Sequence, residues 1–173
     1  MTEQRPARHG PPVEVAEEVL DGRGRQTAAL LARALGAMAI ETGGRDDMPW
    51  ARIHREDVVR AARVCIAPNG LGVDMLHCLL AVDYEDRIEL EYVLFSIAHN
   101  RKALLKVDLP PDDPAIDSVT ELWDAAGWYE RETHDLFGVV FRGNPDLSPL
   151  LLYEGFEGYP GLKSFPLHDY EEW

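Results

Sequence analysis

The sequence is poor in several features that identify common classes of protein. Among its 173 residues there are two cysteines, Cys65 and Cys78, which lie in separate apolar runs without a Cys-x-x-Cys spacing. Two cysteines are too few to hold an iron–sulfur cluster or a closed zinc site, and thiols in a reducing compartment usually stay unpaired. The cysteines therefore predict no cofactor in this chain.

Long hydrophobic runs and positive charge are also scarce. The longest apolar stretch, residues 28–40, is interrupted by Arg33 and is shorter than the roughly 20 residues that a helix needs to cross a bilayer. The chain has 17 Lys and Arg against 31 Asp and Glu, a net charge of −14, whereas a protein that neutralises phosphates carries the opposite sign. Residues 1–12 contain no hydrophobic segment of the kind found in secretory signals. The sequence thus predicts a cytoplasmic protein that neither spans a membrane nor binds nucleic acid.

Motifs for nucleophilic catalysis and phosphate binding are missing as well. There is no Gly-x-Ser-x-Gly, and no Gly-x-Gly-x-x-Gly follows a strand. By elimination, the sequence favours a protein whose task is to bind other proteins.

Composition divides the chain into three parts. Residues 1–26 are rich in Pro, Gly and Arg and are expected to form a mobile N-terminal arm. Residues 27–142 carry the periodic apolar patterns of a domain. Residues 143–173 combine many Gly and Pro with hydrophobes, so we expect an irregular C-terminal tail that binds a partner.

Within the domain, apolar spacing predicts an α+β fold. Helices are expected over residues 28–40, after Thr27 and before the stop signal Gly43-Gly44, and over residues 55–65. A small antiparallel or mixed sheet is predicted as a meander of about three strands over residues 75–84, 88–98 and 103–109. One sheet face is expected to pack under the helices, and the other to be wet near Glu89, Glu91, Lys106 and Asp108.

Two more helical pieces are predicted after the prolines at 110–114. The first begins at Ser118, which has a capping-box spacing to Glu121, and places Val119 and Trp123 on its buried side. The second covers residues 128–138 and ends at Gly138.

The second piece carries the densest set of charges, and these allow three readings. Glu130, His134 and Asp135 could serve a stand-alone metal-dependent hydrolase, although the pattern lacks the second His of a zinc helix. Glu132 and Asp135 could form a general acid and base pair. The favoured interpretation is a charged helix that forms salt bridges within the chain or across an interface.

The same region carries a resemblance to a known family. The segment WYERETHDLFGVVFRGNPDLSPLLLYEGFEGYPGLKSFPL, residues 128–167, resembles the signature region of the thirty-kilodalton subunit, also called the C subunit, of NADH:quinone oxidoreductase (respiratory complex I). This family also includes the related subunit of energy-converting nickel–iron hydrogenases. The resemblance extends over residues 73–167, and its core consists of Glu130, Arg131, Glu132, Asp135, Phe137 and Gly138.

The resemblance implies an α+β subunit without catalytic, metal-binding or cofactor-binding residues of its own. Such a subunit packs in the hydrophilic arm, on the cytoplasmic face of the membrane, against the catalytic large subunit and the small iron–sulfur subunit. Iron–sulfur clusters, and nickel–iron or quinone and flavin, are then expected in those partners. The resemblance implies that the interface includes the six core residues together with Pro145, Asp146, Leu147, Gly158, Pro160, Lys163, Phe165 and Pro166.

Several positions depart from the usual family pattern. Asn144 stands where the family usually has His, and Ser148-Pro149 stands where it usually has Arg-Arg. Near the end of the segment, Lys163 is the basic residue that is left. These changes suggest an altered partner surface, and they leave the quinone reductase and the hydrogenase branches open.

Overall fold

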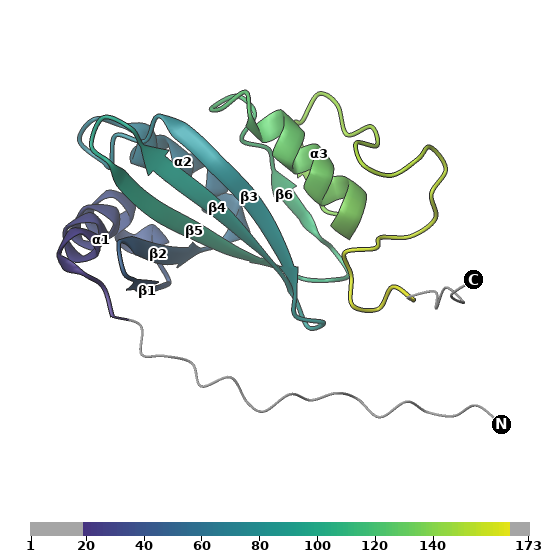
Figure 1. Ribbon diagram of the computed structural model, residues 1–173, viewed down its shortest axis with the longest axis horizontal. Coiled ribbons are helices and arrows are strands. Elements are labelled where there is room, and N and C mark those ends of the chain that lie inside the picture. Colours follow the sequence, from purple (N-terminus) through teal and green to yellow (C-terminus); the bar gives the residue numbers. More distant parts are fainter. Residues whose placement is uncertain (1–18, 167–173) are drawn as a thin grey trace, which may run out of the picture.

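The computed structural model, which describes residues 19–166, is an α+β fold built on one mixed sheet, as predicted (Figure 1). The sheet has the strand order β1-β2-β5-β4-β3, with bounds β1 (Glu41–Arg45), β2 (Met48–Ile53), β3 (Met75–Asp83), β4 (Ile88–Ser96) and β5 (Arg101–Leu109). Among the described residues, no helix has the length and apolar character needed to cross a membrane.

The predicted three-strand meander is confirmed. Strands β3, β4 and β5 pair in antiparallel fashion, and their ends agree with the expected ones to within about two residues. Glu85 and Asn100 occupy the turns with φ of 72° and 47°, a left-handed conformation that Asn adopts more readily than most residues other than glycine.

The hairpin of β1 and β2 was not predicted. Gly43 and Gly44, expected to stop a helix, lie in β1, and β2 joins the meander by pairing in parallel with β5. Glycine suits this hairpin because a Cβ on Gly44 would lie 2.7 Å from the Cα of Pro49 on the paired strand. The two glycines therefore serve a close strand contact, which the sequence pattern did not distinguish from a helix stop.

Helix α1 (Gly22–Leu35) begins earlier than expected. Its N-cap is Asp21, whose carboxylate accepts a hydrogen bond from the Gly24 N–H at 2.7 Å, and not Thr27. The α-helix ends at Leu35, with Gly36 as its C-cap, and a 3-10 turn (Gly36–Met38) follows, so the prediction of helix over residues 28–40 was wrong at both ends. Residues 22–26 belong to this helix and not to an arm, and the rest of the predicted arm up to residue 18 lies outside the described residues.

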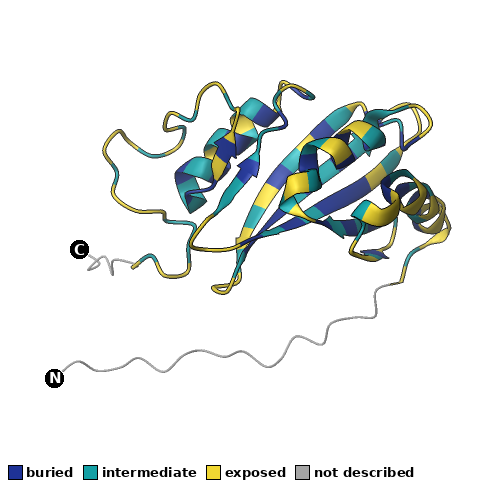
Figure 2. Cartoon of the chain, turned by 180° about the vertical axis from the view of Figure 1, so that it is seen from behind, coloured by how far each residue is buried: buried dark blue, intermediate teal, exposed yellow. Residues whose placement is uncertain are grey.

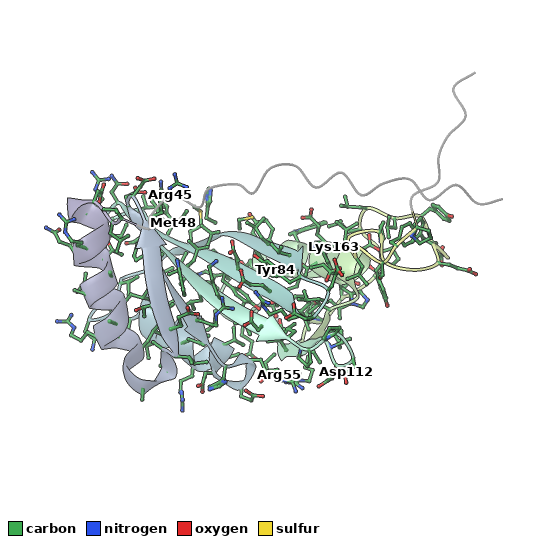
Figure 3. The ribbon with its side chains drawn as sticks, turned by 90° about the horizontal axis from the view of Figure 1, so that it is seen from below. Arg45, Met48, Arg55, Tyr84, Asp112 and Lys163 are labelled. Carbon is green, nitrogen blue, oxygen red and sulfur yellow. The ribbon has the colours of Figure 1, made fainter. Side chains whose placement is uncertain are left out.

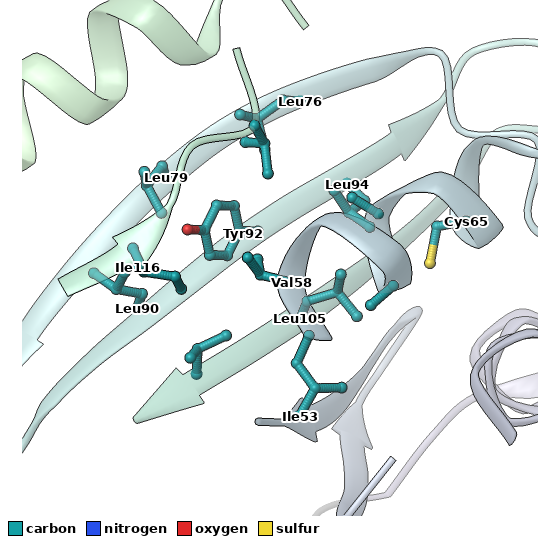
Figure 4. Close-up of a cluster of buried hydrophobic side chains, with 14 of the residues drawn as sticks. Ile53, Val58, Cys65, Leu76, Leu79, Leu90, Tyr92, Leu94, Leu105 and Ile116 are labelled. Carbon is teal, nitrogen blue, oxygen red and sulfur yellow. The ribbon is translucent and has the colours of Figure 1, made fainter. Parts of the chain in front are cut away.

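Helix α2 (Val58–Ile66) confirms the second predicted helix, with a short 3-10 turn (Arg55–Asp57) before it. Figure 2 shows α1 and α2 lying on the same face of the sheet, which we call the covered face. The apolar core lies between these layers. Figure 4 shows Val58 of α2 beside Tyr92 and Leu105 of the sheet.

A parallel pair of short strands, β6 (Ala115–Asp117) and β7 (Val140–Arg142), extends the second layer. Fully buried Ile116 of β6 packs beside Leu90 and Tyr92 of β4 (Figure 4). Helix α3 (Ala126–Phe137) then runs along β3, as Figure 1 shows, and confirms the helix predicted over residues 128–138.

The helix predicted from Ser118 does not form. Residues 118–125 form turns at 120–122 and 124–125 and no helix, and the Ser118 hydroxyl donates to the Glu130 carboxylate at 2.7 Å. The predicted buried side was nevertheless right, since Val119 and Trp123 are buried.

Within residues 19–166, no helix lies on the opposite face of the sheet, which we call the open face (Figure 1). It was predicted to be wet near Glu89, but Glu89 is 2% exposed. Arg52 and Lys106 close over its carboxylate at 2.9 and 3.3 Å. Burial opposes ionisation of Glu89, but the two cations outweigh it and lower the pKa of this carboxyl.

Candidate interaction site

The charged residues of α3 lie where the C-terminal tail meets the domain. From residue 143 to residue 166 the chain forms neither helix nor strand, as expected for an irregular tail. Three side chains of α3 hold the first part of the tail, residues 144–152, and we call this set of contacts the helix–tail joint. It consists of Glu130, Arg131 and Asp135 with their partners.

Asp135 binds the backbone of three consecutive tail residues. One of its carboxylate oxygens, Oδ2, accepts hydrogen bonds from the N–H groups of Leu150, Leu151 and Leu152 at 3.2, 2.8 and 2.9 Å. Desolvation would raise the pKa of Asp135, but the three N–H donors outweigh it and lower that pKa below its ordinary value. Asp135 thus acts as a clamp on the tail backbone in its ionised form.

Arg131 turns toward the tail as well. Its guanidinium donates from Nε to the Ser148 carbonyl at 3.1 Å and from Nη2 to the Pro149 carbonyl at 3.0 Å. It also lies 3.6 Å from the Asp146 carboxylate and 5.2 Å from the centre of the Trp128 ring. Because Arg131 binds carbonyls at 148 and 149, this contact does not depend on the Ser148-Pro149 side chains that depart from the family pattern.

Glu130 is fully buried and joins three segments. Its carboxylate accepts from the Val119 N–H at 2.8 Å, from the Ser118 hydroxyl at 2.7 Å and from the Asn144 amide at 2.8 Å. Burial raises the pKa of Glu130, and the three donors oppose that rise only in part. Asn144, which replaces the usual His, therefore supplies a donor to this buried carboxylate.

A second anchor fixes the end of the described tail. The Gly161 N–H donates to the Leu136 carbonyl at 2.8 Å, and the Lys163 N–H donates to the Asp83 carboxylate at 2.8 Å. Gly138 ends α3 with φ of 75°, and the Tyr159 ring covers it. Figure 3 shows Lys163 beside Tyr84, at the end of β3.

The remaining predicted interface residues are spread along the tail. Leu147 packs against the core and Phe165 stacks on Phe156 at a centroid distance of 5.8 Å, beside Gly158. Phe137 and Pro160 are half-buried, whereas Pro145, Asp146 and Pro166 are exposed. Their contacts with another subunit stay a prediction.

Glu132 differs from its neighbours. Its side chain is exposed on α3, and within residues 19–166 it makes no hydrogen bond or ion pair. Burial raises the pKa of the Cys78 thiol, and the negative charge of Glu132 adds to that rise, so this carboxylate lies close to β3.

The geometry does not support the hydrolase hypothesis. Glu130 and Asp135 bind different segments, and the His134 ring meets the Val139 carbonyl at 2.9 Å. In the part of the chain that the structure describes, no three His, Cys, Asp or Glu side chains converge as metal ligands would. An acid and base pair of Glu132 and Asp135 is not supported either, since Asp135 Oδ2 accepts from three tail N–H groups, which favour the ionised form of this carboxylate.

Sequence reasoning missed several members of these anchors. Ser118 was assigned to a helix cap, and Asn144 and Asp83 were given no binding role. The backbone groups of residues 148–152 carry no sequence signal for accepting or donating. Only the helical spacing of Arg131 and Asp135, which places them on one side of α3, could have indicated a shared target.

Comparison with known proteins places these features in a family. Residues 51–171 match the family described as respiratory-chain NADH dehydrogenase, 30 Kd subunit. The C subunit of the NADH-quinone oxidoreductase of Novosphingobium aromaticivorans is 45% identical over 148 residues, which cover 82% of this chain and 46% of that protein. The corresponding protein of Burkholderia thailandensis is 34% identical and is covered to 77%, whereas that of Neorickettsia sennetsu is 39% identical and is covered to 58%. The chain therefore spans about half the length of some curated relatives.

Solved structures show the same fold. A trypsin-resistant fragment of Nqo5 superposes with a TM-score of 0.59 at 28% identity, covering 69% of this chain and 97% of the fragment. A chain of the membrane-bound sulfane sulfur reductase, an archaeal respiratory membrane complex, superposes with a TM-score of 0.72 at 26% identity, covering 83% of this chain and 86% of that one. Together with the family match over helix α3 and the tail, these likenesses show that the chain belongs to the family of the 30-kDa subunit of the respiratory-chain NADH dehydrogenase.

Proposed function

We propose that the chain is the 30-kDa-type subunit of a complex I-like, membrane-bound NADH:quinone oxidoreductase and that it acts there without catalytic residues of its own. The family match over residues 51–171 carries this proposal, because it includes the whole helix–tail joint. The names of the curated relatives favour the quinone reductase branch. A nickel–iron hydrogenase-type complex is the other arrangement that the family resemblance implies.

The proposed role is to brace the catalytic large subunit and the small iron–sulfur subunit on the cytoplasmic face of the membrane. Electrons pass through iron–sulfur clusters, flavin and quinone held by those partners. The contribution of this chain is structural, because it holds those partners in position. The helix–tail joint fixes the backbone of the tail, so the tail loses less conformational entropy when a partner binds it.

Exposed hydrophobes along the tail fit this role. Leu151, Tyr153 and Tyr159 are exposed by 59%, 71% and 43%, which is costly in water and favourable in an interface. Tyr153 also packs edge-on against Phe156 at a centroid distance of 5.3 Å, so these two rings already contact each other without a partner.

The test is a pull-down of the tagged chain from membranes of its native host in a mild detergent, followed by mass spectrometry and metal analysis. We expect an iron–sulfur subunit and a large subunit to co-purify with flavin and iron but without nickel. Nickel in the captured complex would assign the chain to the hydrogenase branch. A monodisperse monomer that captures no other protein of such a complex would contradict the proposal.

A matched pair of variants connects the result to the joint. Asp135→Ala releases the tail and should reduce capture of the partners. Asp112→Ala, at an exposed acid in the loop after β5, should leave capture unchanged, because no described residue binds the Asp112 carboxylate. Equal loss in both variants would show that net charge, not tail order, determines assembly.

A further inference from the structure

The open face of the sheet has two unlike halves. Across β2 and β5, the charges neutralise one another. Arg52 binds Glu41 at 3.1 Å and Glu89 at 2.9 Å, and Lys106 binds Glu91 at 2.6 Å. A network whose charges already neutralise one another needs no charge from a partner, and burying it under a partner would cost desolvation free energy.

The half formed by β3 is apolar. Register places Cys78, Leu80 and Val82 on the open face, since they pair with Val93, Glu91 and Glu89 of β4 while Leu79 pairs with buried Tyr92. Leu80 and Val82 are 46% and 37% exposed. When one face of an antiparallel sheet is solvated, apolar side chains toward the core usually alternate along each strand with polar side chains toward water. At these positions β3 has apolar side chains on the open face as well, which is the pattern of a strand that is covered on both sides.

Helix α3 borders this strip and adds one unpaired charge. The Tyr129 hydroxyl donates to the His77 carbonyl at 2.8 Å, which fixes one side of α3 against β3. Glu132 lies three residues further along the helix, on that same side, and exposed Trp128 lies one turn before Glu132. Within the described residues, Glu132 is thus an unpaired carboxylate at the margin of an apolar strip that consists of Cys78, Leu80 and Val82.

We infer that this strip and Glu132 form a docking surface for a partner-protein segment that presents aliphatic or aromatic side chains to Leu80 and Val82 and a Lys or Arg to Glu132. This inference rests on the proposed function, because the partner is another subunit of the complex. A second copy of the chain fits poorly. The cations of its open face, Arg52, Lys102 and Lys106, already bind carboxylates, and pairing one with Glu132 would break an existing contact.

Photo-crosslinking in the native host tests the surface without removing a core residue. A photoreactive phenylalanine analogue replaces Leu80 in the tagged chain, and the matched control places it at Ile97, which is 64% exposed in the turn between β4 and β5. After capture of the complex, we expect Leu80 to crosslink to another subunit, through a peptide that contains Lys or Arg among apolar residues. Ile97 should give no such product.

Charge reversal gives the second measurement. Because Glu132 is exposed and unpaired among the described residues, Glu132→Lys should leave the melting temperature of the isolated chain unchanged but lower capture of the crosslinked partner by roughly tenfold or more. Restoring capture by changing the partner's basic residue to Glu would establish the pair.

The outcomes separate the two proposals. If the other subunits co-purify but Leu80 crosslinks only to a second copy, or no better than Ile97, the docking surface is wrong and the proposed function stands. If the unmodified chain captures none of the other subunits, the proposed function fails and the docking surface fails with it.

Discussion

The covered face of the sheet and the helix–tail joint are held in place by different physical means. Between the sheet and helices α1 and α2, stability comes from apolar side chains such as Leu105, Leu94 and Leu31, all at most 1% exposed. In the joint, residues 144–152 of the tail are fixed by a few directed polar contacts to Glu130, Arg131 and Asp135. Burial is spread over many residues, whereas the joint depends on these three side chains.

This difference separates folding from tail order. Loss of one apolar contact in the core weakens the whole cooperative unit, because every element packs on it. Loss of one polar clamp in the joint leaves the core intact and frees only the tail, as expected for a segment with its own low opening free energy. The signature charges of the family are therefore expected to matter for assembly more than for folding of the domain.

The largest effect is expected in the core. Leu105→Ala removes a fully buried side chain beneath α2 and should lower the free energy of unfolding by about 2–5 kcal/mol. The control is Leu80→Ala on the open face, which is 46% exposed and should cost about 1 kcal/mol or less. Chemical denaturation measures both. Equal losses would mean that the open face is as well packed as the covered face.

Asp135→Ala should release the tail without unfolding the domain. Hydrogen bonds to a charged group contribute about 1.5–3 kcal/mol, so protection of the Leu150, Leu151 and Leu152 amides should fall by roughly 10- to 100-fold. Hydrogen exchange with mass spectrometry measures this loss, and amides of β4 serve as the internal control. A matching loss of protection in β4 would show that the joint supports the core.

The same clamp should depend on pH in a defined direction. Because the folded state lowers the pKa of Asp135 below 3.8, its stabilising contribution is present above that pH and is lost as the pH falls through the lower, folded pKa. The difference in stability between Asp135→Asn and the parent chain should therefore be largest near neutral pH and smallest in strong acid. A difference that grows as the pH falls would contradict the clamp.

The same contrast explains what the sequence could predict. Apolar periodicity encodes the core, and residues 55–65, 75–84, 88–98 and 103–109 were placed correctly because their side chains alternate or repeat against one buried face. The hairpin of β1 and β2 was missed because a Gly-Gly pair is compatible both with the end of a helix and with a close contact between strands. The helix at Ser118 was wrongly predicted because the target of its hydroxyl, Glu130, lies twelve residues away in sequence.

The candidate site was predicted only in its residue types. Glu130, Arg131 and Asp135 were singled out from the resemblance and from helical spacing, but their targets were not. Two of these side chains bind the backbone of residues 148–152, and backbone groups are common to nearly every residue type. A local pattern cannot reveal such a long-range contact.

A smaller effect is expected at the junction of α3 with the second anchor. Gly138→Ala places a Cβ at φ of 75° and 2.7 Å from the Tyr159 ring, so it should cost about 1–2 kcal/mol and displace the tail end. Gly143→Ala is the control, because its φ of 91° also lies in the region that L side chains rarely adopt, while beyond the two chain neighbours no described atom lies within 4 Å of the new Cβ. The difference between the two melting temperatures measures the cost of the clash with the Tyr159 ring. Equal melting temperatures would show that this clash costs nothing.

The smallest effect concerns a hydroxyl inside the core. The Tyr92 hydroxyl is buried without a hydrogen-bond partner among the described residues, and burial followed by the charge of Glu130 raises the pKa of this phenol well above its ordinary value. Tyr92→Phe removes a desolvated group and breaks no bond, so stability should stay unchanged or rise by up to about 1 kcal/mol.

Tyr129→Phe provides the matched comparison for Tyr92. It deletes the hydroxyl that donates to the His77 carbonyl at 2.8 Å, and it should cost about 0.5–1.5 kcal/mol. Denaturation of both variants under one condition therefore compares a satisfied hydroxyl with an unsatisfied one in the same fold. If Tyr92→Phe proved the more costly change, the Tyr92 hydroxyl would have to donate to a buried acceptor. The Glu130 carboxylate, whose charge adds to the raised pKa of this phenol, would then be the candidate, and it would link the core directly to the helix–tail joint.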